Sequence, residues 1–218
     1  MKAGVLAFDE NVLVAYKPNN VDFDYFSTQL VQKAKSKREC EPLALYNLED
    51  NLSGVCLYSL NEEVAKTLHT QINNGVLEMT YYAVVVGRPK EDRGIYSACV
   101  KRDAKTGLIG HIPMLNQGAI NFAFEYQVVE CVDKISLIKI SSVIFDQELL
   151  RFALADLGCP VFGDKQYKGD SLAKDTFVAL SLVDLRFGYL VDDTTLFFRA
   201  MPSGKPWSYF NLDKIFKI

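Results

Sequence analysis

Short apolar runs alternate with turn residues along most of the chain. The runs are rich in Val, Ile, Leu and aromatic residues and are bounded by Asp, Asn, Gly or Pro, which is typical of strands. On this basis we expect strands at 5–8, 12–16, 55–60, 77–86, 96–100, 119–132, 135–145, 177–187 and 195–200.

Three other segments carry apolar residues at helical spacing. They predict helices at 25–37, between Asn61 and Gly75, and at 147–157, where Gly158 and Pro160 form a stop signal. Many strands with three helices interspersed predict an α+β fold, with a large, mostly antiparallel mixed sheet and flanking helices. Because no repeat or linker divides the sequence, we expect residues 1–218 to form a single domain.

Composition describes a folded chain, with 49% hydrophobic and 23% charged residues. The first residues run straight into a strand pattern and no apolar run reaches membrane-spanning length, so we expect an intracellular, most simply cytoplasmic, protein without membrane attachment. The five cysteines form no CxxC pair and only two histidines are present, so we expect no metal site and reduced, mostly core thiols.

The overall charge does not favour a nucleic-acid partner. The chain has 24 Lys and Arg residues and 27 Asp and Glu residues, which gives a net charge of −3. Phosphate contacts, in contrast, come from clustered basic residues. Two local clusters can still coexist with an acidic total, namely 33–38 and Lys101-Arg102 with Lys105. The cluster at 33–38 is equally typical of the solvated end of a helix.

An acidic loop carries the first candidate chemistry. Glu49 and Asp50 precede Ser53-Gly54, which turns into an apolar strand. A loop of this kind places a carboxylate at the end of a rigid strand, where sites are often built. Taken alone, the segment is also what an ordinary acidic turn beside a buried strand looks like.

Three further segments follow this loop or precede it at characteristic intervals. They are the strand ending in Lys17-Pro18, the strand 77–87 with Tyr81, and the stretch Leu-Gly-x-Pro-x-x-Gly-Asp-x-x-Tyr at 157–167. In this order and spacing the sequence resembles the RluA-type RNA pseudouridine synthases over most of its length. No single segment is specific, whereas four in the right order are.

The resemblance implies an activity on RNA, either rRNA or tRNA, that needs no cofactor. Such enzymes flip a uridine out of its stack, detach its base from the ribose, turn the base and reattach it through carbon. An aspartate, a tyrosine that contacts the base and an arginine that holds the aspartate ionised form their site. On this chain the tyrosine and the arginine correspond to Tyr81 and Arg151, and the aspartate position is Glu49, with Asp50 one residue later.

The departures from the family pattern bear on both catalysis and RNA binding. Tyr46-Asn47 replaces a His-Arg pair, and residues 145–150 read Phe-Asp-Gln-Glu-Leu-Leu in place of Gly-Arg-Thr-His-Gln-Ile. Glutamate adds one methylene, and a misplacement of about 1 Å can cost roughly 100-fold in rate. Asp146 and Glu148 add negative charge where RNA should approach. As nucleic-acid contacts we expect Lys17, Asn47, Lys101 and Arg102.

Three functions remain compatible with the sequence. The first is an RNA-binding protein of this type in which Glu49 has reduced or abolished isomerisation. The second is an active synthase that uses Glu49 or Asp50, and the third is a protein-interaction module on the same fold. We expect no separate N-terminal RNA-binding domain, because little sequence precedes Val5. A steep fall of RNA affinity with salt would separate RNA binding from the third function.

Overall fold

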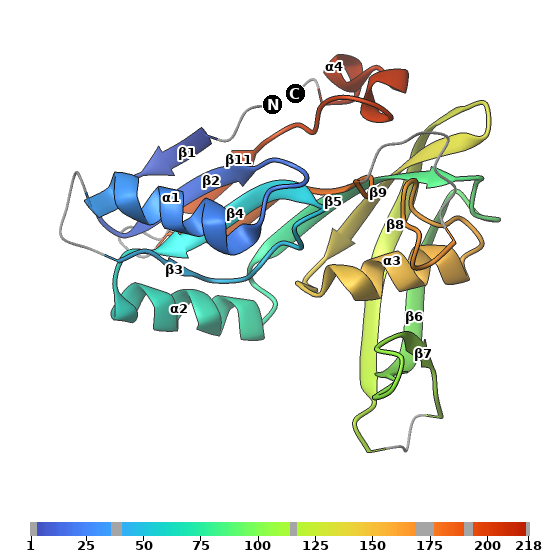
Figure 1. Ribbon diagram of the computed structural model, residues 1–218, viewed down its shortest axis with the longest axis horizontal. Helices are drawn as coiled ribbons and strands as arrows, with labels where there is room; N and C mark the ends of the chain where they lie inside the picture. The colour runs from blue at the N-terminus through green and yellow to red at the C-terminus, as the bar shows by residue number, and fades with distance from the viewer. Residues whose placement is uncertain (1–3, 36–40, 114–116, 169–176, 190–193, 217–218) are drawn as a thin grey trace.

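The computed structural model describes residues 4–35, 41–113, 117–168, 177–189 and 194–216. Its helices and strands, drawn in Figure 1, are β1 Gly4–Phe8, β2 Val12–Lys17, α1 Phe23–Lys35, β3 Leu43–Ala44, β4 Ser53–Ser59, α2 Glu62–Asn73, β5 Glu78–Val86, β6 Arg93–Arg102, β7 Ile109–His111, β8 Ile120–Val132, β9 Ile135–Ser142, α3 Gln147–Asp156, β10 Leu180–Gly188, β11 Thr195–Arg199, the 3-10 helix η1 Trp207–Tyr209 and α4 Leu212–Ile215.

The described strands form one eleven-stranded sheet. Nine strands follow the order β1-β2-β4-β10-β5-β9-β8-β6-β7, while β11 pairs with β10 and β3 with β4. The pairing of β4 with β10 is parallel, and the other described pairs are antiparallel. The predicted α+β class, with a large and mostly antiparallel sheet, is therefore confirmed.

Most predicted elements are present with shifted ends. The predicted strand at 96–100 is longer, because all of β6 from Arg93 to Arg102 pairs with β8 or β7. The predicted strand at 135–145 ends at Ser142, whose hydroxyl accepts a hydrogen bond from the Ile144 N–H and turns the chain toward α3. The predicted helix 25–37 starts at Phe23, and its last two residues lie outside the described part. The sequence pattern gave no indication of β3, β7 and the short C-terminal helices.

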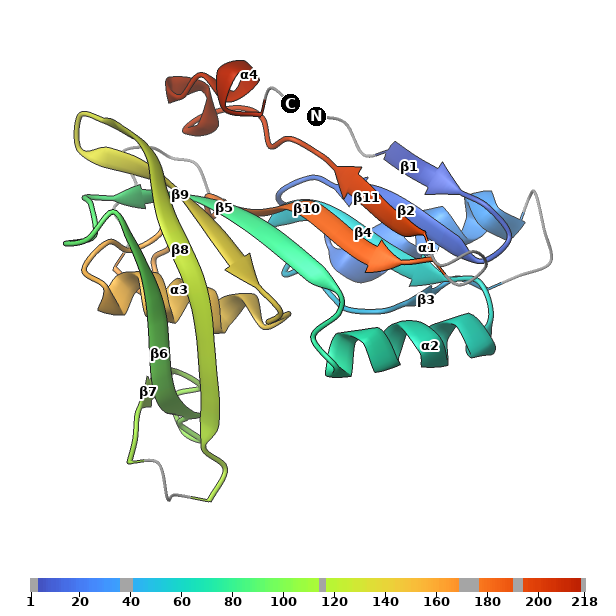
Figure 2. The same cartoon turned by 180° about the vertical axis from the view of Figure 1, so that it is seen from behind.

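Helices α1 and α3 cover the same face of the sheet. Both lie in front of the strands in Figure 1 and behind them in Figure 2. Strands β6 and β8 extend beyond α3 and, with β7, form a projection that we call the hairpin arm, residues 93–113 and 117–127. On the opposite face of β5, Tyr82 packs against Phe216, the residue that ends α4.

The centre of the sheet positions the acidic loop. Gly54, at the start of β4, pairs with Leu182 of β10 in parallel register and with Lys17 of β2. A Cβ atom on Gly54 would lie 2.7 Å from the Leu182 carbonyl oxygen, so only glycine permits this approach. Tyr81 of β5 also pairs with Leu182. The loop before β4 and the predicted tyrosine are thus separated by one strand.

The structural findings on cysteines, metals and membranes concern the described residues only. Cys56 and Cys159 are buried as expected for core thiols, but Cys131 is exposed, and Cys40 lies outside the described residues. Within the described ranges, no three His, Cys, Asp or Glu residues are grouped so that they could hold a metal ion. None of the described helices is both long and apolar enough to cross a membrane.

Candidate active site

A carboxylate–guanidinium pair joins the acidic loop to helix α3. Nη2 of Arg151 donates a hydrogen bond to Oε2 of Glu49 at 2.8 Å. The Arg151 side chain is only 4% exposed, whereas that of Glu49 is 32% exposed. The structure therefore brings together two of the three residues that the sequence indicated for catalysis, as a solvent-reachable carboxylate backed by a buried cation.

Arg151 has a second carboxylate partner that is buried more deeply. Its Nη1 donates to Oδ2 of Asp164 at 3.0 Å, and the Asp164 side chain is 2% exposed. The guanidinium also lies within 3.4 and 3.5 Å of Oε1 of Gln166 and 5.6 Å from the centre of the Tyr167 ring. Asp164, Gln166 and Tyr167 thus contact the Arg151 guanidinium in addition to Glu49.

The chain reaches this position through a tight turn after α3. Val161 forms an isolated bridge with Val85 of β5, and the Phe162 N–H donates to the Val84 carbonyl at 2.8 Å. Gly163 follows with a φ of +84°, and a Cβ atom there would lie 2.2 Å from the Phe177 carbonyl oxygen. The glycine in the Gly-Asp-x-x-Tyr motif is therefore required for Asp164 to turn back toward Arg151.

The backbone of the Glu49 loop is held by a buried lysine. The Lys17 ammonium donates to the carbonyl oxygens of Glu49 and Asp50, each at 3.0 Å, and of Leu52 at 2.8 Å. Lys17 is 0% exposed, so this geometry argues against the predicted contact with nucleic acid. Burial lowers the Lys17 pKa to about 8, against the opposing influence of Cys56 and nearby carboxyl groups. Its observed role is to shape the loop.

Asp50 faces a different partner from Glu49. Its Oδ1 accepts a hydrogen bond at 2.9 Å from the N–H of Phe23, the first residue of α1. This N–H has no partner within its own helix, so Asp50 stabilises the helix start. Of the two carboxylates that the sequence offers, Glu49 is thus the one that contacts Arg151.

A glutamine that no sequence motif marks connects the loop to Tyr81. Oε1 of Gln147 accepts the Glu49 N–H at 3.2 Å, and its Nε2 donates to the Asn47 carbonyl at 3.1 Å. The Gln147 side chain also acts to lower the pKa of Tyr81, whose hydroxyl donates to the Ile144 carbonyl at 3.4 Å. A glutamine at the start of an amphipathic helix has no distinctive sequence signature, so the pattern could not single it out.

Tyr81 lies beneath the site and is fully enclosed. It is 0% exposed, and burial raises the pKa of its hydroxyl well above the usual value, so the group stays protonated at neutral pH. Contact between Tyr81 and a flipped base stays a prediction, and it requires a neighbouring side chain to move.

Burial and nearby charges shift the pKa of Glu49 and of Arg151. Burial raises the pKa of Glu49, Arg151 opposes this rise, and the nearby charges of Glu148 and Asp146 add to it. For Arg151, burial acts to lower the pKa, but Glu49 and Asp164 outweigh it and raise the value. The pKa values of both partners are thus raised, and perturbed pKa values cluster at functional sites.

The two acidic residues at the start of α3 have structural partners. Oδ1 of Asp146 accepts the N–H groups of Glu148 at 3.0 Å and Leu149 at 3.3 Å, which makes it the N-cap of the helix. Glu148 forms an ion pair with Arg102 of the hairpin arm, and Arg102 also lies 3.8 Å from Asp146. Their negative charge is thus partly compensated from within the chain.

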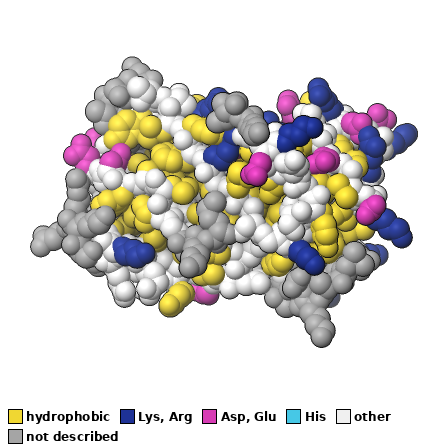
Figure 3. All heavy atoms as spheres, turned by 90° about the horizontal axis from the view of Figure 1, so that it is seen from above, with side chains coloured by type: hydrophobic (Ala, Val, Ile, Leu, Met, Phe, Trp, Pro, Cys, Tyr) yellow, Lys and Arg dark blue, Asp and Glu magenta, His cyan; other side chains and the backbone are white. Residues whose placement is uncertain are grey.

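The remaining nucleic-acid candidates lie at the surface. Asn47, Lys101 and Arg102 are exposed, and the Lys101 ammonium donates to the Gln117 carbonyl at 2.9 Å. On the face shown in Figure 3, basic and acidic side chains are interspersed. Of the sequence cluster at 33–38, residues 36–38 lie outside the described part. Whether any of these groups meets RNA stays a prediction.

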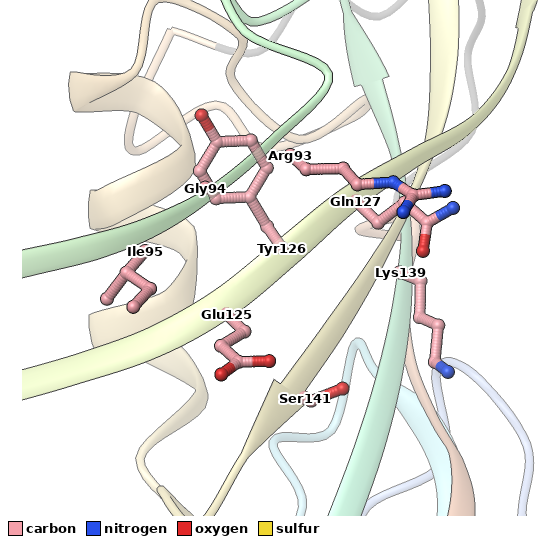
Figure 4. Close-up of a pocket in the computed structure, with 8 residues that line it drawn as sticks. All are labelled: Arg93, Gly94, Ile95, Glu125, Tyr126, Gln127, Lys139 and Ser141. Atoms are coloured by element: carbon pink, nitrogen blue, oxygen red, sulfur yellow. The ribbon is translucent and has the colours of Figure 1, made fainter.

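A pocket of about 450 Å³ lies away from the Glu49–Arg151 pair. Because side chains alternate along a strand, Tyr96 and Phe124 face α3, while Ile95 and Glu125 face the opposite side. Figure 4 shows that pocket, which is lined by Arg93, Gly94, Ile95, Glu125, Tyr126, Gln127, Lys139 and Ser141. It contains none of the residues that the sequence indicated for chemistry.

Known proteins similar to this sequence are RNA pseudouridine synthases, although no protein-family model matches it. The chain is 23% identical over 174 residues to ribosomal large subunit pseudouridine synthase C of Rickettsia bellii, covering 75% of this chain and 56% of that protein. It is 26% identical over 179 residues to an uncharacterised RNA pseudouridine synthase of Chlorobaculum parvum, with coverages of 79% and 55%. For mitochondrial pseudouridylate synthase RPUSD4 of Danio rerio the identity is 25% over 223 residues, with coverages of 84% and 61%. The chain thus spans little more than half the length of these relatives.

Solved structures agree on the fold. Human RNA pseudouridylate synthase domain containing 4 matches with a TM-score of 0.74 and 16% identity, over 92% of this chain and 88% of that one. Human RNA pseudouridylate synthase domain containing 1 matches with a TM-score of 0.75 and 18% identity, over 92% and 83%. The protein has the pseudouridine synthase fold. Together with the sequence relatives, this confirms the RluA-type resemblance found from the motifs.

Proposed function

We propose that this chain binds RNA and isomerises uridine to pseudouridine, with Glu49 as the catalytic carboxylate. The observation that carries the proposal is the 2.8 Å pair between Glu49 and Arg151, in which the carboxylate is partly exposed and the guanidinium buried. The names of the relatives support the reaction class.

The reaction class defines what Glu49 has to do. The bond between C1′ of the ribose and N1 of uracil breaks, a bond from C1′ to C5 forms, and the proton on C5 is replaced by one on N1. Nothing is oxidised or reduced. An ionised carboxylate can attack the sugar or accept the C5 proton, and both roles require close placement. Arg151 keeps Glu49 oriented and opposes the rise in its pKa caused by burial.

A second candidate is RNA binding without isomerisation. Two observations favour it: Tyr81 is fully enclosed, and the candidate carboxylate is a glutamate, one methylene longer than the aspartate of the family motif. Both candidates require RNA to approach past Asp146 and Glu148, whose charge Arg102 partly compensates. In the first candidate the Glu49 carboxylate reaches the ribose or the base of the bound uridine, and in the second it reaches neither.

The test combines an RNA map with a reaction assay. Pseudouridine would be mapped across the transcriptome of cells with and without the gene, and in deletion cells that express wild type, Glu49→Gln or Glu78→Gln. Glu78 is the matched control, because its side chain is 65% exposed and pairs with Arg186 rather than Arg151. RNA containing each mapped site, labelled with tritium at C5 of uridine, would then be incubated with the purified variants.

We expect a site that disappears on deletion and returns with wild type and Glu78→Gln but not with Glu49→Gln. Tritium release should follow the same pattern. An unchanged map, combined with RNA binding that weakens steeply with salt, would replace isomerisation by the second candidate. Activity that survives Glu49→Gln would remove Glu49 from the mechanism.

A further inference from the structure

Glu148 occupies the centre of a hydrogen-bond network beside the Glu49–Arg151 pair. Its Oε1 accepts hydrogen bonds from Nε2 of Gln166 at 2.7 Å and from the hydroxyl of Tyr167 at 2.8 Å. Its Oε2 accepts from Nη1 of Arg102, with which it forms an ion pair. Three donors from two separate segments therefore converge on one side chain that is 12% exposed.

The residues that Glu148 holds are the ones that contact Arg151. Oε1 of Gln166 lies 3.4 and 3.5 Å from the two terminal nitrogens of Arg151, and the Tyr167 ring lies beneath the guanidinium carbon at 5.6 Å. The Gln166 N–H donates to Asp164 at 3.1 Å, and Asp164 is the buried partner of Arg151. A change at Glu148 can thus reach Arg151 through two routes without direct contact.

Arg102 connects the same network to the hairpin arm. It lies at the end of β6, where it pairs with Ile109 of β7 and also donates to the Gly107 carbonyl at 2.9 Å. Hydrogen bonding to Glu148 raises the pKa of Arg102, and the donors around Glu148 lower the pKa of that carboxyl group despite its burial. Both groups are therefore charged at neutral pH, so the arm is tied to α3 by an ion pair.

We propose that Glu148 is a positioning residue of the site, which holds residues 164–167 against Arg151 and joins them to the hairpin arm through Arg102. Its effect on catalysis rests on the proposed isomerisation by Glu49, but its effect on the geometry of Arg151 does not. Glu148 thereby has a role within the site besides adding negative charge where RNA would approach. Its ion pair with Arg102 links the arm to the residues that contact Arg151.

A double-mutant cycle tests this role. Tyr167→Phe removes one donor to Glu148 without changing charge or ring size, and Glu148→Leu removes the acceptor. Each single variant should lower the rate constant of tritium release about three- to tenfold, as expected for the loss of a hydrogen bond that fixes a reacting group. The double variant should be no slower than Glu148→Leu alone. Effects that simply multiply would refute the proposal.

A second readout does not depend on any activity. The pKa of Glu49 would be followed from its carboxyl carbon by NMR in the same four proteins. Because Tyr167→Phe leaves all charges unchanged, a raised Glu49 pKa in that variant reports weaker placement of Arg151. The same substitution should have no further effect in the Glu148→Leu protein. An unchanged Glu49 pKa on Tyr167→Phe would overturn the inference, even if isomerisation were absent.

Control variants separate positioning from a general loss of stability. Glu78→Leu breaks the ion pair in which Oε2 of Glu78 lies 3.6 Å from Nη1 of Arg186. Both side chains are more than half exposed. This change should leave both the rate and the Glu49 pKa unaltered. Circular dichroism would establish that each variant folds, and Tyr167→Phe, the mildest change, keeps the test decisive if Glu148→Leu does not fold. A Glu78→Leu effect as large as that of Tyr167→Phe would also refute a specific role.

Discussion

The removal of the Arg151 guanidinium should destabilise the fold as well as the site. Arg151→Met keeps an unbranched side chain in α3 but leaves the Asp164 carboxylate without its cation. The Asp164 side chain is 2% exposed and would retain the Gln166 N–H at 3.1 Å. Removing one partner of a buried ion pair typically costs about 3–5 kcal/mol, because the other charge remains buried.

The loss of stability is expected to arise mainly at one of the two carboxylates. Glu49 is 32% exposed, so water can replace much of what it loses, and the main cost falls on Asp164. We therefore expect the free energy of unfolding to fall by about 3–5 kcal/mol, which corresponds to a decrease of roughly 6–20 °C in melting temperature for a chain of this size. Urea unfolding followed by circular dichroism would measure it.

A second substitution makes this reasoning falsifiable. Asp164→Asn in the Arg151→Met protein replaces the unpaired charge by an amide, which costs less to bury. We expect it to recover at least half of the lost stability, while Asp164→Asn alone is destabilising. If Arg151→Met costs less than about 1 kcal/mol, or if the second substitution recovers nothing, Asp164 is not the buried counter-ion of Arg151.

Three other changes probe the loop and the turn around the site. Burial raises the pKa of Glu49, so the stability contributed by protonating this side chain is fully present below the unfolded-state pKa of about 4.3 and is lost as pH rises through the folded-state pKa. Over that pH window, urea unfolding should show the stability of Glu49→Gln rising relative to that of wild type. No relative rise would contradict the pKa shift. Gly163→Ala should lower the free energy of unfolding, measured by thermal unfolding, by at least about 2 kcal/mol. The added Cβ atom would lie 2.2 Å from the Phe177 carbonyl oxygen, at a φ of +84°. A neutral effect would mean that the turn relaxes. Lys17→Met should lower the free energy of unfolding by about 1–3 kcal/mol, because it leaves the buried Leu52 carbonyl unpaired. It should also speed amide hydrogen exchange in the loop before β4. Unchanged exchange there would show that Lys17 does not hold the loop.

The fold is largely predictable because its strands are buried on both faces or alternate clearly. The 12–16 and 77–86 runs are almost entirely buried in the structure, and apolar runs of this length between turn residues are typical of buried strands. The two-residue strand β3 and the three-residue strand β7 could not be predicted, because segments this short have no periodicity. Their existence depends on the neighbouring strands β4 and β6.

Lys17 shows where sequence reasoning about the site fails. The sequence predicts Lys17 as a contact for nucleic acid, and lysine is rarely buried without a partner. Its partners in the structure are the backbone carbonyls of the loop 49–52, and backbone groups leave no trace in the sequence. The same holds for Asp146, whose negative charge suggests repulsion of RNA, although an Asp before a helix can equally be its N-cap.

The charge of Arg102 makes it a candidate, but its position could not be predicted. Its ion pair with Glu148 depends on the register of β6 against β7 and β8 and on how the hairpin arm packs beside α3. A one-residue shift in that register would turn Arg102 to the other face of the sheet. The sequence therefore supplies charged candidates that are distant from one another along the chain, and only the tertiary structure can pair them.

Glu49 stands where the sequence resemblance predicts an aspartate, and contacts at both ends of the residue hold it in place. The loop is fixed by bonds to its backbone, from Lys17 to three carbonyls and from the Glu49 N–H to Gln147, so its shape does not depend on the side chain at position 49. The far end of that side chain is fixed by Arg151, which is itself held by Asp164. Both the backbone and the carboxylate of Glu49 are therefore anchored. The position of the carboxylate is thus tied to Arg151, and that of Arg151 to the buried Asp164.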